Sequence, residues 1–175
     1  MSAPGTPPRG LDGVVAAATR LSHVDGLAGQ LIIGGYELKE LAGRVSFDEA
    51  AHLLWRGHLP SPDDLAMMKN EMAALRRLPA ETMSVVRGAA KAPPIDVLRM
   101  ACATLSLDLA SSEDISPAAD LGAAKMLTAR FPTIVAAHAR IAAGEQPIAP
   151  RNDLGLAANF LLMLSGQKPT ARPAA

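Results

Sequence analysis

The 175-residue chain has a mass of 18.1 kDa and carries 17 basic and 17 acidic side chains, so its formal net charge is zero. This balance gives no electrostatic footprint for nucleic acid, and 49% hydrophobic with 19% charged residues excludes disorder of the whole chain. The single cysteine, Cys102, excludes a disulfide scaffold and a cysteine-based zinc site, and it fits a reducing compartment. Because aromatic residues make up only 3%, the composition favours helices over sheets.

The first ten residues, MSAPGTPPRG, are rich in proline and glycine and lack a continuous apolar run. We therefore expect residues 1–10 to form a flexible lead-in, since a signal peptide needs a positive start followed by an apolar segment. No apolar stretch approaches the roughly 20 residues that a membrane helix needs. The sequence thus predicts no membrane partner and a cytoplasmic location.

Residues 11–36 are the only part of the chain in which the sequence predicts strands. Two apolar stretches, residues 14–21 and 30–33, flank an Asp25-Gly26 pair. Asp-Gly between apolar runs is a hairpin signal. We therefore expect a short β-hairpin that turns at Asp25-Gly26.

From residue 37 to residue 168 the chain shows helix signals, and residues 169–175 are expected to be a frayed tail. Ser46 and Glu49 have the spacing of a capping box, which predicts a helix from Phe47 to about Arg56. Caps, glycines and prolines predict further helices over residues 62–75, 80–90, 95–109, 117–143 and 153–165. The fold class is therefore mainly α, with a short N-terminal β-hairpin.

Three of these predicted helices carry further expectations. Residues Leu65, Met68, Met72 and Leu75 recur at helical spacing and indicate one buried face, so Met67, Met68 and Met72 are interpreted as core filling. On the helix at 95–109, the expected face consists of Ile95, Leu98, Cys102 and Leu105. In the helix at 117–143, Pro132 should cause a kink or a break, because proline removes a hydrogen bond and clashes with the preceding turn.

Candidate chemistry among the histidines is weak. His52 follows Asp48 by four residues on one predicted helix, and such a pair can orient a base or bind metal. Two ligands make no metal site, however, and His58 lies beyond the helix end, so a role for His52 at the surface or the core edge is favoured. Gly34-Gly35 is not a phosphate loop, because it lacks the surrounding glycine pattern.

The sequence also contains two possible arrangements of a nucleophile and a base. Ser22, His23 and Asp25 suggest a triad, but neighbouring residues of an extended segment point to opposite faces. Cys102 and His138 could meet as thiol and base across two helices, although a buried, inert thiol on an apolar helix face is favoured. The residues themselves therefore assign no catalytic, cofactor-binding or metal-binding residue.

Several stretches, taken together, resemble the citrate synthase family. The segment that begins at Gly10 matches that family's N-terminal segment at Ser22, Val24, Asp25, Gly26, Leu31, Gly35, Tyr36, Leu41 and Ala42. The stretches SFDEAAHLLWRGHLPSPDDL, FPTIVAAHARIAAGEQPIAP and ANFLLMLSG, with Pro169 after them, also fit the family pattern. The resemblance covers about residues 10–169. One departure is that Ile33 and Gly34 replace the Tyr-Arg of the usual Y-R-G-Y.

The resemblance implies an acyltransferase of the tricarboxylic acid cycle or its 2-methylcitrate counterpart, and it does not separate citrate from 2-methylcitrate synthases. Such enzymes condense an acyl-CoA, acetyl-CoA or propionyl-CoA, with oxaloacetate. In the family, the catalytic histidines, the catalytic aspartate and the substrate-binding arginines lie from an H-A-D-H-G segment onward, and no position here matches them. We therefore expect an N-terminal portion, truncated or a split subunit, that binds no cofactor and is inactive alone.

The resemblance also implies partners. The family's counterparts of helices 95–109 and 117–143 lie at the dimer interface, so we expect a homo-oligomer or pairing with a complementary C-terminal chain. An alternative is a non-catalytic helical interaction or regulatory module that dimerises with itself or with an intact homologue, which relaxed constraint at Ile33-Gly34 would favour. A helical protein unrelated to citrate synthases is a third, weaker alternative.

Overall fold

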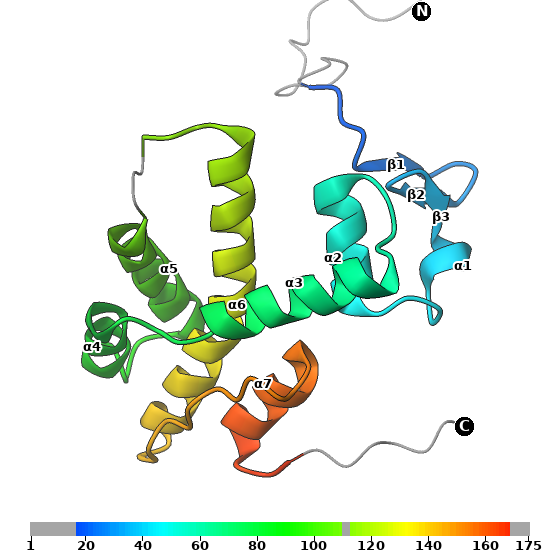
Figure 1. Ribbon diagram of the computed structural model, residues 1–175. Coiled ribbons are helices and arrows are strands. Elements are labelled where there is room, and N and C mark those ends of the chain that lie inside the picture. The colour runs from blue at the N-terminus through cyan, green and yellow to red at the C-terminus, as the bar shows by residue number, and fades with distance from the viewer. Residues whose placement is uncertain (1–16, 110–112, 169–175) are drawn as a thin grey trace, which may run out of the picture. The chain divides into compact units, whose positions relative to one another are not determined.

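The structure is a computed structural model that describes residues 17–109 and 113–168, and it divides into two compact units between Ser61 and Pro62. These described residues contain three short strands, seven α-helices and one 3-10 helix (Figure 1). The predicted fold class, mainly α with a small N-terminal sheet, is confirmed. In the described ranges, no helix combines the length and apolarity that crossing a bilayer requires.

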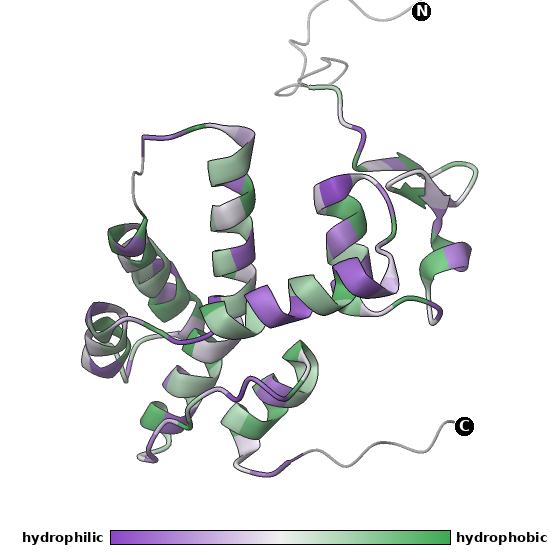
Figure 2. Ribbon diagram, in the orientation of Figure 1, coloured by the Kyte–Doolittle hydropathy of each residue, from purple (hydrophilic) through white to green (hydrophobic). Residues whose placement is uncertain are grey.

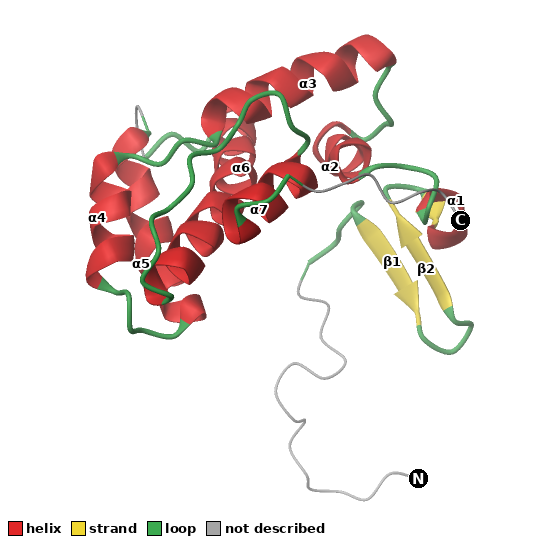
Figure 3. Ribbon diagram, turned by 90° about the horizontal axis from the view of Figure 1, so that it is seen from below, coloured by secondary structure: helices red, strands yellow, loops and turns green. Residues whose placement is uncertain are grey.

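The strands of the first unit are β1 (Ser22–Asp25), β2 (Gln30–Ile33) and β3 (Tyr36–Glu37), in one antiparallel sheet of that order (Figure 3). The turn lies where Asp25-Gly26 predicts it, and the Asp25 carboxylate accepts hydrogen bonds from the N–H groups of Leu27 and Ala28. That turn pairs Asp25 with Gln30, which fixes the register. The prediction of a strand over residues 14–21 is wrong for the described residues 17–21, because pairing begins only at Ser22; residues 14–16 lie outside the described part.

The helices of the first unit are the single turn α1 (Leu38–Leu41) and α2 (Phe47–Arg56). The predicted capping box of α2 is confirmed: the Ser46 hydroxyl accepts from the Glu49 N–H, and the Glu49 carboxylate accepts from the Ser46 N–H. Gly57 ends the helix in the left-handed conformation, with φ of +83°. The helix therefore has the bounds that its flanking residues predict.

The second unit is built around one long helix. Helix α6 (Pro117–Ala142) packs against α3 (Pro62–Leu75), α4 (Ala80–Gly88), α5 (Pro94–Thr104) and α7 (Leu156–Ser165). A short 3-10 helix, η1 (Leu105–Asp108), follows α5. The buried core consists of Val86, Val97, Ala101, Leu105, Met126, Ile134 and Ala137.

The buried faces agree with the sequence for α3 and differ in part for α5. On α3, hydrophilic and hydrophobic residues alternate around the helix (Figure 2), and Met68 and Met72 are buried as predicted, although Met67 is exposed. On α5 the buried stripe is Val97, Ala101 and Leu105, whereas Ile95 is 68% exposed. Of the predicted face, Leu105 is buried and Leu98 packs against the core, so the prediction is wrong for Ile95 and agrees in part with the buried stripe.

Two predictions about helices need correction. Helix α6 has the predicted extent, but of the two alternatives at Pro132 the break is wrong, because the helix continues through the proline. Helix α7 begins at Leu156 rather than at Asp153, since the preceding residues, instead of forming a helical turn, make the polar contacts described below.

Candidate functional site

Two of the four histidines meet in the first unit. His52 is buried, and its Nδ1 lies 3.0 Å from the carbonyl oxygen of His58, while the Nδ1 of His58 lies 2.9 Å from the carbonyl oxygen of Leu59. Since a carbonyl can only accept, each Nδ1 carries the proton. The two rings pack edge to face with centroids 5.1 Å apart. His52 is thus a buried structural residue rather than a surface one, and it donates to a backbone carbonyl rather than to Asp48.

The two nucleophile–base pairs that the sequence disfavours form no hydrogen bond in the structure. Cys102 is half-buried, and His138 is buried on α6, but no hydrogen bond joins the thiol to the imidazole. Ser22 and His23 are consecutive residues of β1 and therefore face opposite sides of the sheet. Within residues 17–109 and 113–168, no cluster of three or more His, Cys, Asp or Glu residues could hold a metal ion.

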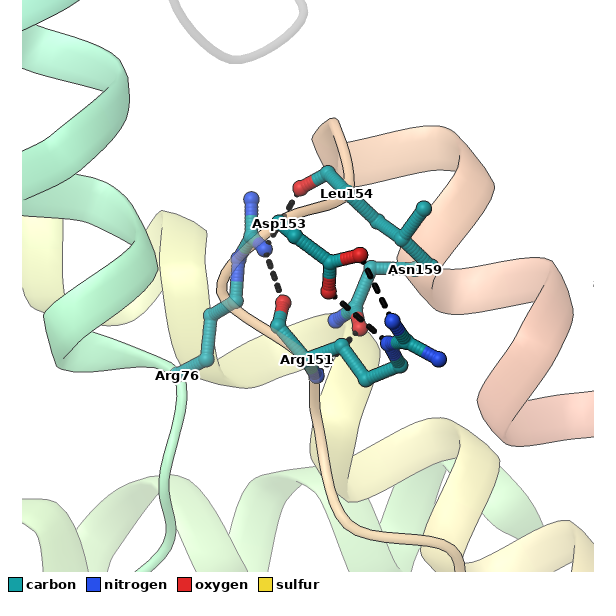
Figure 4. Close-up of polar contacts among 5 residues, drawn as sticks. All are labelled: Arg76, Arg151, Asp153, Leu154 and Asn159. Carbon is teal, nitrogen blue, oxygen red and sulfur yellow. Dashed lines mark hydrogen bonds and ion pairs between the residues drawn. The ribbon is translucent and has the colours of Figure 1, made fainter.

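A buried arginine in the second unit was not anticipated from the sequence. Arg76 follows α3 and is only 3% exposed, and its Nη1 donates to the carbonyl oxygens of Arg151 and Leu154, both at 2.7 Å (Figure 4). A charge-assisted hydrogen bond to two carbonyls fixes the segment before α7 against the end of α3. The burial of Arg76 could have been predicted from the helical period, because positions 68, 72 and 76 lie on one face of the helix.

The residues that Arg76 binds form a polar network of their own. The side-chain oxygen of Asn159, on α7, accepts from the Arg151 N–H at 2.8 Å, and the Arg151 guanidinium forms a bidentate pair with the Asp153 carboxylate (Figure 4). The hydrogen bonds from Arg151 lower the pKa of Asp153 below its ordinary value. Because that ion pair is exposed, its main effect is to order the segment rather than to stabilise the fold.

A second buried arginine, Arg130 of α6, joins three elements. Its Nη2 lies 2.7 Å from the Asp108 carboxylate of η1, and its Nε donates to the carbonyl oxygen of Leu75 at 3.1 Å. Both arginines, Arg76 and Arg130, therefore bind backbone carbonyls or a carboxylate of the same unit. Neither arrangement contains the nucleophile, base and electrophilic donor that a catalytic centre needs.

The remaining feature is a set of exposed apolar side chains on one segment, named here the α5 surface. It consists of Ile95 and Met100 of α5 and Leu107 of η1, which are 68%, 42% and 70% exposed. On α6, by contrast, no large hydrophobic side chain is exposed. Of the two predicted interaction helices, the segment at 95–109 therefore exposes large apolar side chains and α6 does not. Elsewhere in this unit Met67, Ile115, Leu161 and Leu164 are also exposed.

Comparison with known proteins supplies the family. The family model described as "Citrate synthase, C-terminal domain" matches residues 10–175. The chain is 39% identical over 166 residues to the citrate synthase of Haloferax volcanii, covering 92% of this chain and 44% of that protein. It is also 39% identical over 165 residues to the 2-methylcitrate synthase of Mycobacterium tuberculosis, covering 92% of this chain and 41% of that protein.

The fold comparison gives the same result. The citrate synthase of Pyrobaculum aerophilum superimposes with a TM-score of 0.85 and 33% sequence identity, over 98% of this chain and 45% of that one. The chain thus spans less than half the length of the relatives that it matches. With sequence and fold in agreement along nearly all of its length, the chain belongs to the citrate synthase family.

Proposed function

We propose that this chain forms the helical scaffold of a citrate-synthase-type acyltransferase that condenses acetyl-CoA or propionyl-CoA with oxaloacetate. The single observation that carries this proposal is the family match over residues 10–175. Citrate synthase and 2-methylcitrate synthase relatives match the chain equally well, at 39% identity each, so either acyl-CoA is a candidate co-substrate. The half-buried Cys102, a free thiol, supports a cytoplasmic location as part of the same proposal.

We further propose that the chain is inactive alone and acquires activity with a complementary chain. Condensation requires a base to remove a proton next to the thioester and donors to stabilise the resulting oxyanion. The imidazoles of His52 and His58 are held by backbone carbonyls, and His138 is buried. None of these rings lies in a site with a carboxylate base, so the proposal assigns the reacting groups to the partner.

The test is a thiol-release assay with oxaloacetate and either acyl-CoA. The purified chain is assayed alone and after mixing with the part of the Haloferax volcanii citrate synthase that this chain does not match. We expect no turnover by the chain alone and turnover by the mixture. Turnover by the chain alone would overturn the proposed inactivity, and a mixture that forms a complex without turnover would favour the second function below.

The second candidate function is a non-catalytic interaction module that dimerises with itself or with an intact homologue. The α5 surface favours it, because an exposed apolar surface serves binding without any chemistry. The Ile33-Gly34 departure does not add to this alternative. Gly34 has a positive φ and lies against Leu53, so the residue fits a specific packing arrangement.

A further inference from the structure

A cleft of about 340 Å³ lies in the second unit. Its walls come from pairs of residues one helical turn apart: Met83 and Arg87 on α4, and Thr133 and Ala137 on α6. The remaining walls are Arg77 and Leu78, between α3 and α4, and the segment of residues 147–150, named here the strap. The cleft is therefore lined by apolar side chains and by two arginines.

The strap is held at both ends by arginines. Before it, the Arg140 Nε donates to the carbonyl oxygen of Gln146 at 2.7 Å, and the Arg140 guanidinium pairs with Glu145 at 2.9 Å. After it, the buried Arg76 donates to the carbonyl oxygen of Arg151 at 2.7 Å. Because both ends are fixed by charge-assisted hydrogen bonds, the cleft is formed before any ligand arrives.

Two kinds of polar group in the cleft are available to a ligand. Arg77 and Arg87 are exposed, and neither forms an ion pair with any described residue. Thr133 is 5% exposed, and its buried hydroxyl has no hydrogen-bond partner in the described part of the chain. A buried hydroxyl without a partner costs stability, which a ligand acceptor could recover.

We propose that this cleft binds a small organic anion that carries a carboxylate or phosphate head on a short apolar body. Guanidinium groups bind carboxylates and phosphates through parallel hydrogen bonds, so Arg77 and Arg87 hold the head. The side chains of Leu78, Met83 and Ile148 contact the body. The binding proposed here involves only the residues of the cleft and is separate from the proposed condensation.

The test is methyl NMR of the full chain, observing Met83 and Ile148 during titration with hexanoate, hexyl phosphate, hexanol and inorganic phosphate. We expect saturable shifts with hexanoate or hexyl phosphate below about 10 mM, and no saturation with hexanol. The stronger of the two anions identifies the head group. Unchanged methyl signals with both anions, or equal shifts with hexanol, would overturn the proposal. Shifts with inorganic phosphate alone would show binding of an anion only and would contradict the proposed contact with an apolar body.

Variants separate binding from folding. R77Q and R87Q should each weaken binding by about tenfold, whereas R44Q, at an exposed arginine of the first unit, should leave it unchanged. T133V should weaken binding while the unliganded chain melts at the same or a higher temperature, because the variant removes an unpartnered buried hydroxyl. Unaltered binding in both arginine variants would overturn the assignment of the head group.

Discussion

Gly34 and Leu53 are in such close contact that the position of one depends on the other. A Cβ added at Gly34 would lie 2.8 Å from the Leu53 Cγ, and Gly34 has a φ of +56°. Leu53 is only 1% exposed and cannot simply turn away into solvent. The glycine that departs from the family's Y-R-G-Y pattern therefore allows the end of β2 to approach α2 directly.

Replacing Gly34 with alanine should destabilise the chain by about 2–4 kcal/mol. About 1–2 kcal/mol comes from the left-handed backbone and the rest from crowding against Leu53. G35A is the matched control, since Gly35 also has a positive φ, +92°, but open space at its Cβ position. Urea denaturation measures both free energies of unfolding. Equal losses in the two variants would contradict the role of the contact.

A double-mutant cycle sharpens this test. In an L53A background the contact is absent, so the additional cost of G34A should fall to about that of the backbone alone, 1–2 kcal/mol. L53A itself should cost about 2–5 kcal/mol, because it leaves a cavity. Strict additivity of the two changes would show that the glycine is needed only for its conformation.

Arg76 provides a second prediction about stability. Arg76→Met keeps much of the side-chain volume but removes the donors for the carbonyl oxygens of Arg151 and Leu154. Leaving these acceptors without their partner should lower the free energy of unfolding by about 2–4 kcal/mol. R77M, at the exposed neighbouring arginine, should change it by no more than about 0.5 kcal/mol. Thermal and urea unfolding provide the comparison, and similar losses in the two variants would contradict the buried role.

The elements predicted correctly from the sequence are those whose ends are encoded locally. Helix α2 has the predicted bounds because Ser46, Glu49 and Gly57 act within one turn of the helix. The turn after Asp25 was predicted for the same reason. The start of β1 was not, because strand pairing depends on the opposite strand and not on the apolar stretch that precedes Ser22.

Tertiary contacts account for what the sequence could not show. The position of Arg76 on the apolar face of α3 indicates burial, but its partners lie 75 and 78 residues further along the chain. The contact of Thr133 with a cleft likewise depends on the strap, whose path is fixed by Arg140 and Arg76. Spacing within one helix carries no information on such partners.

The Arg151–Asp153 pair predicts a dependence of stability on pH. The hydrogen bonds from Arg151 lower the pKa of Asp153 in the folded chain below the ordinary value of 3.8. A lowered carboxylate pKa contributes stability above the unfolded pKa, and this contribution is lost as the pH falls through the folded pKa. The parent should therefore be slightly more stable than D153N at neutral pH, and the difference should shrink as the pH falls below 3.8 and through the lower pKa of the folded chain.

The control for this prediction is R151M, which removes the guanidinium but keeps the backbone N–H that donates to Asn159. In R151M the further change D153N should have little effect at any pH between about 3 and 7. Urea unfolding at a series of pH values measures the difference. A difference between parent and D153N that does not change across that range would contradict the assigned pKa direction.

The α5 surface predicts self-association or binding of a complementary chain through Ile95 and Leu107, which are 68% and 70% exposed. The dissociation constant of the variant I95S/L107S should be at least about 100-fold higher than that of the parent, since each buried side chain contributes about 1.5–3 kcal/mol. L27S, which removes a fully exposed leucine of the first unit, is the matched control and should associate like the parent. Sedimentation velocity over a range of concentrations, with and without the complementary chain, measures these constants.

Because the two side chains are exposed, their loss should leave the melting temperature of the monomer unchanged, so weaker association cannot be attributed to unfolding. A parent chain that sediments only as a monomer in both conditions would show that the α5 surface is not an interaction site.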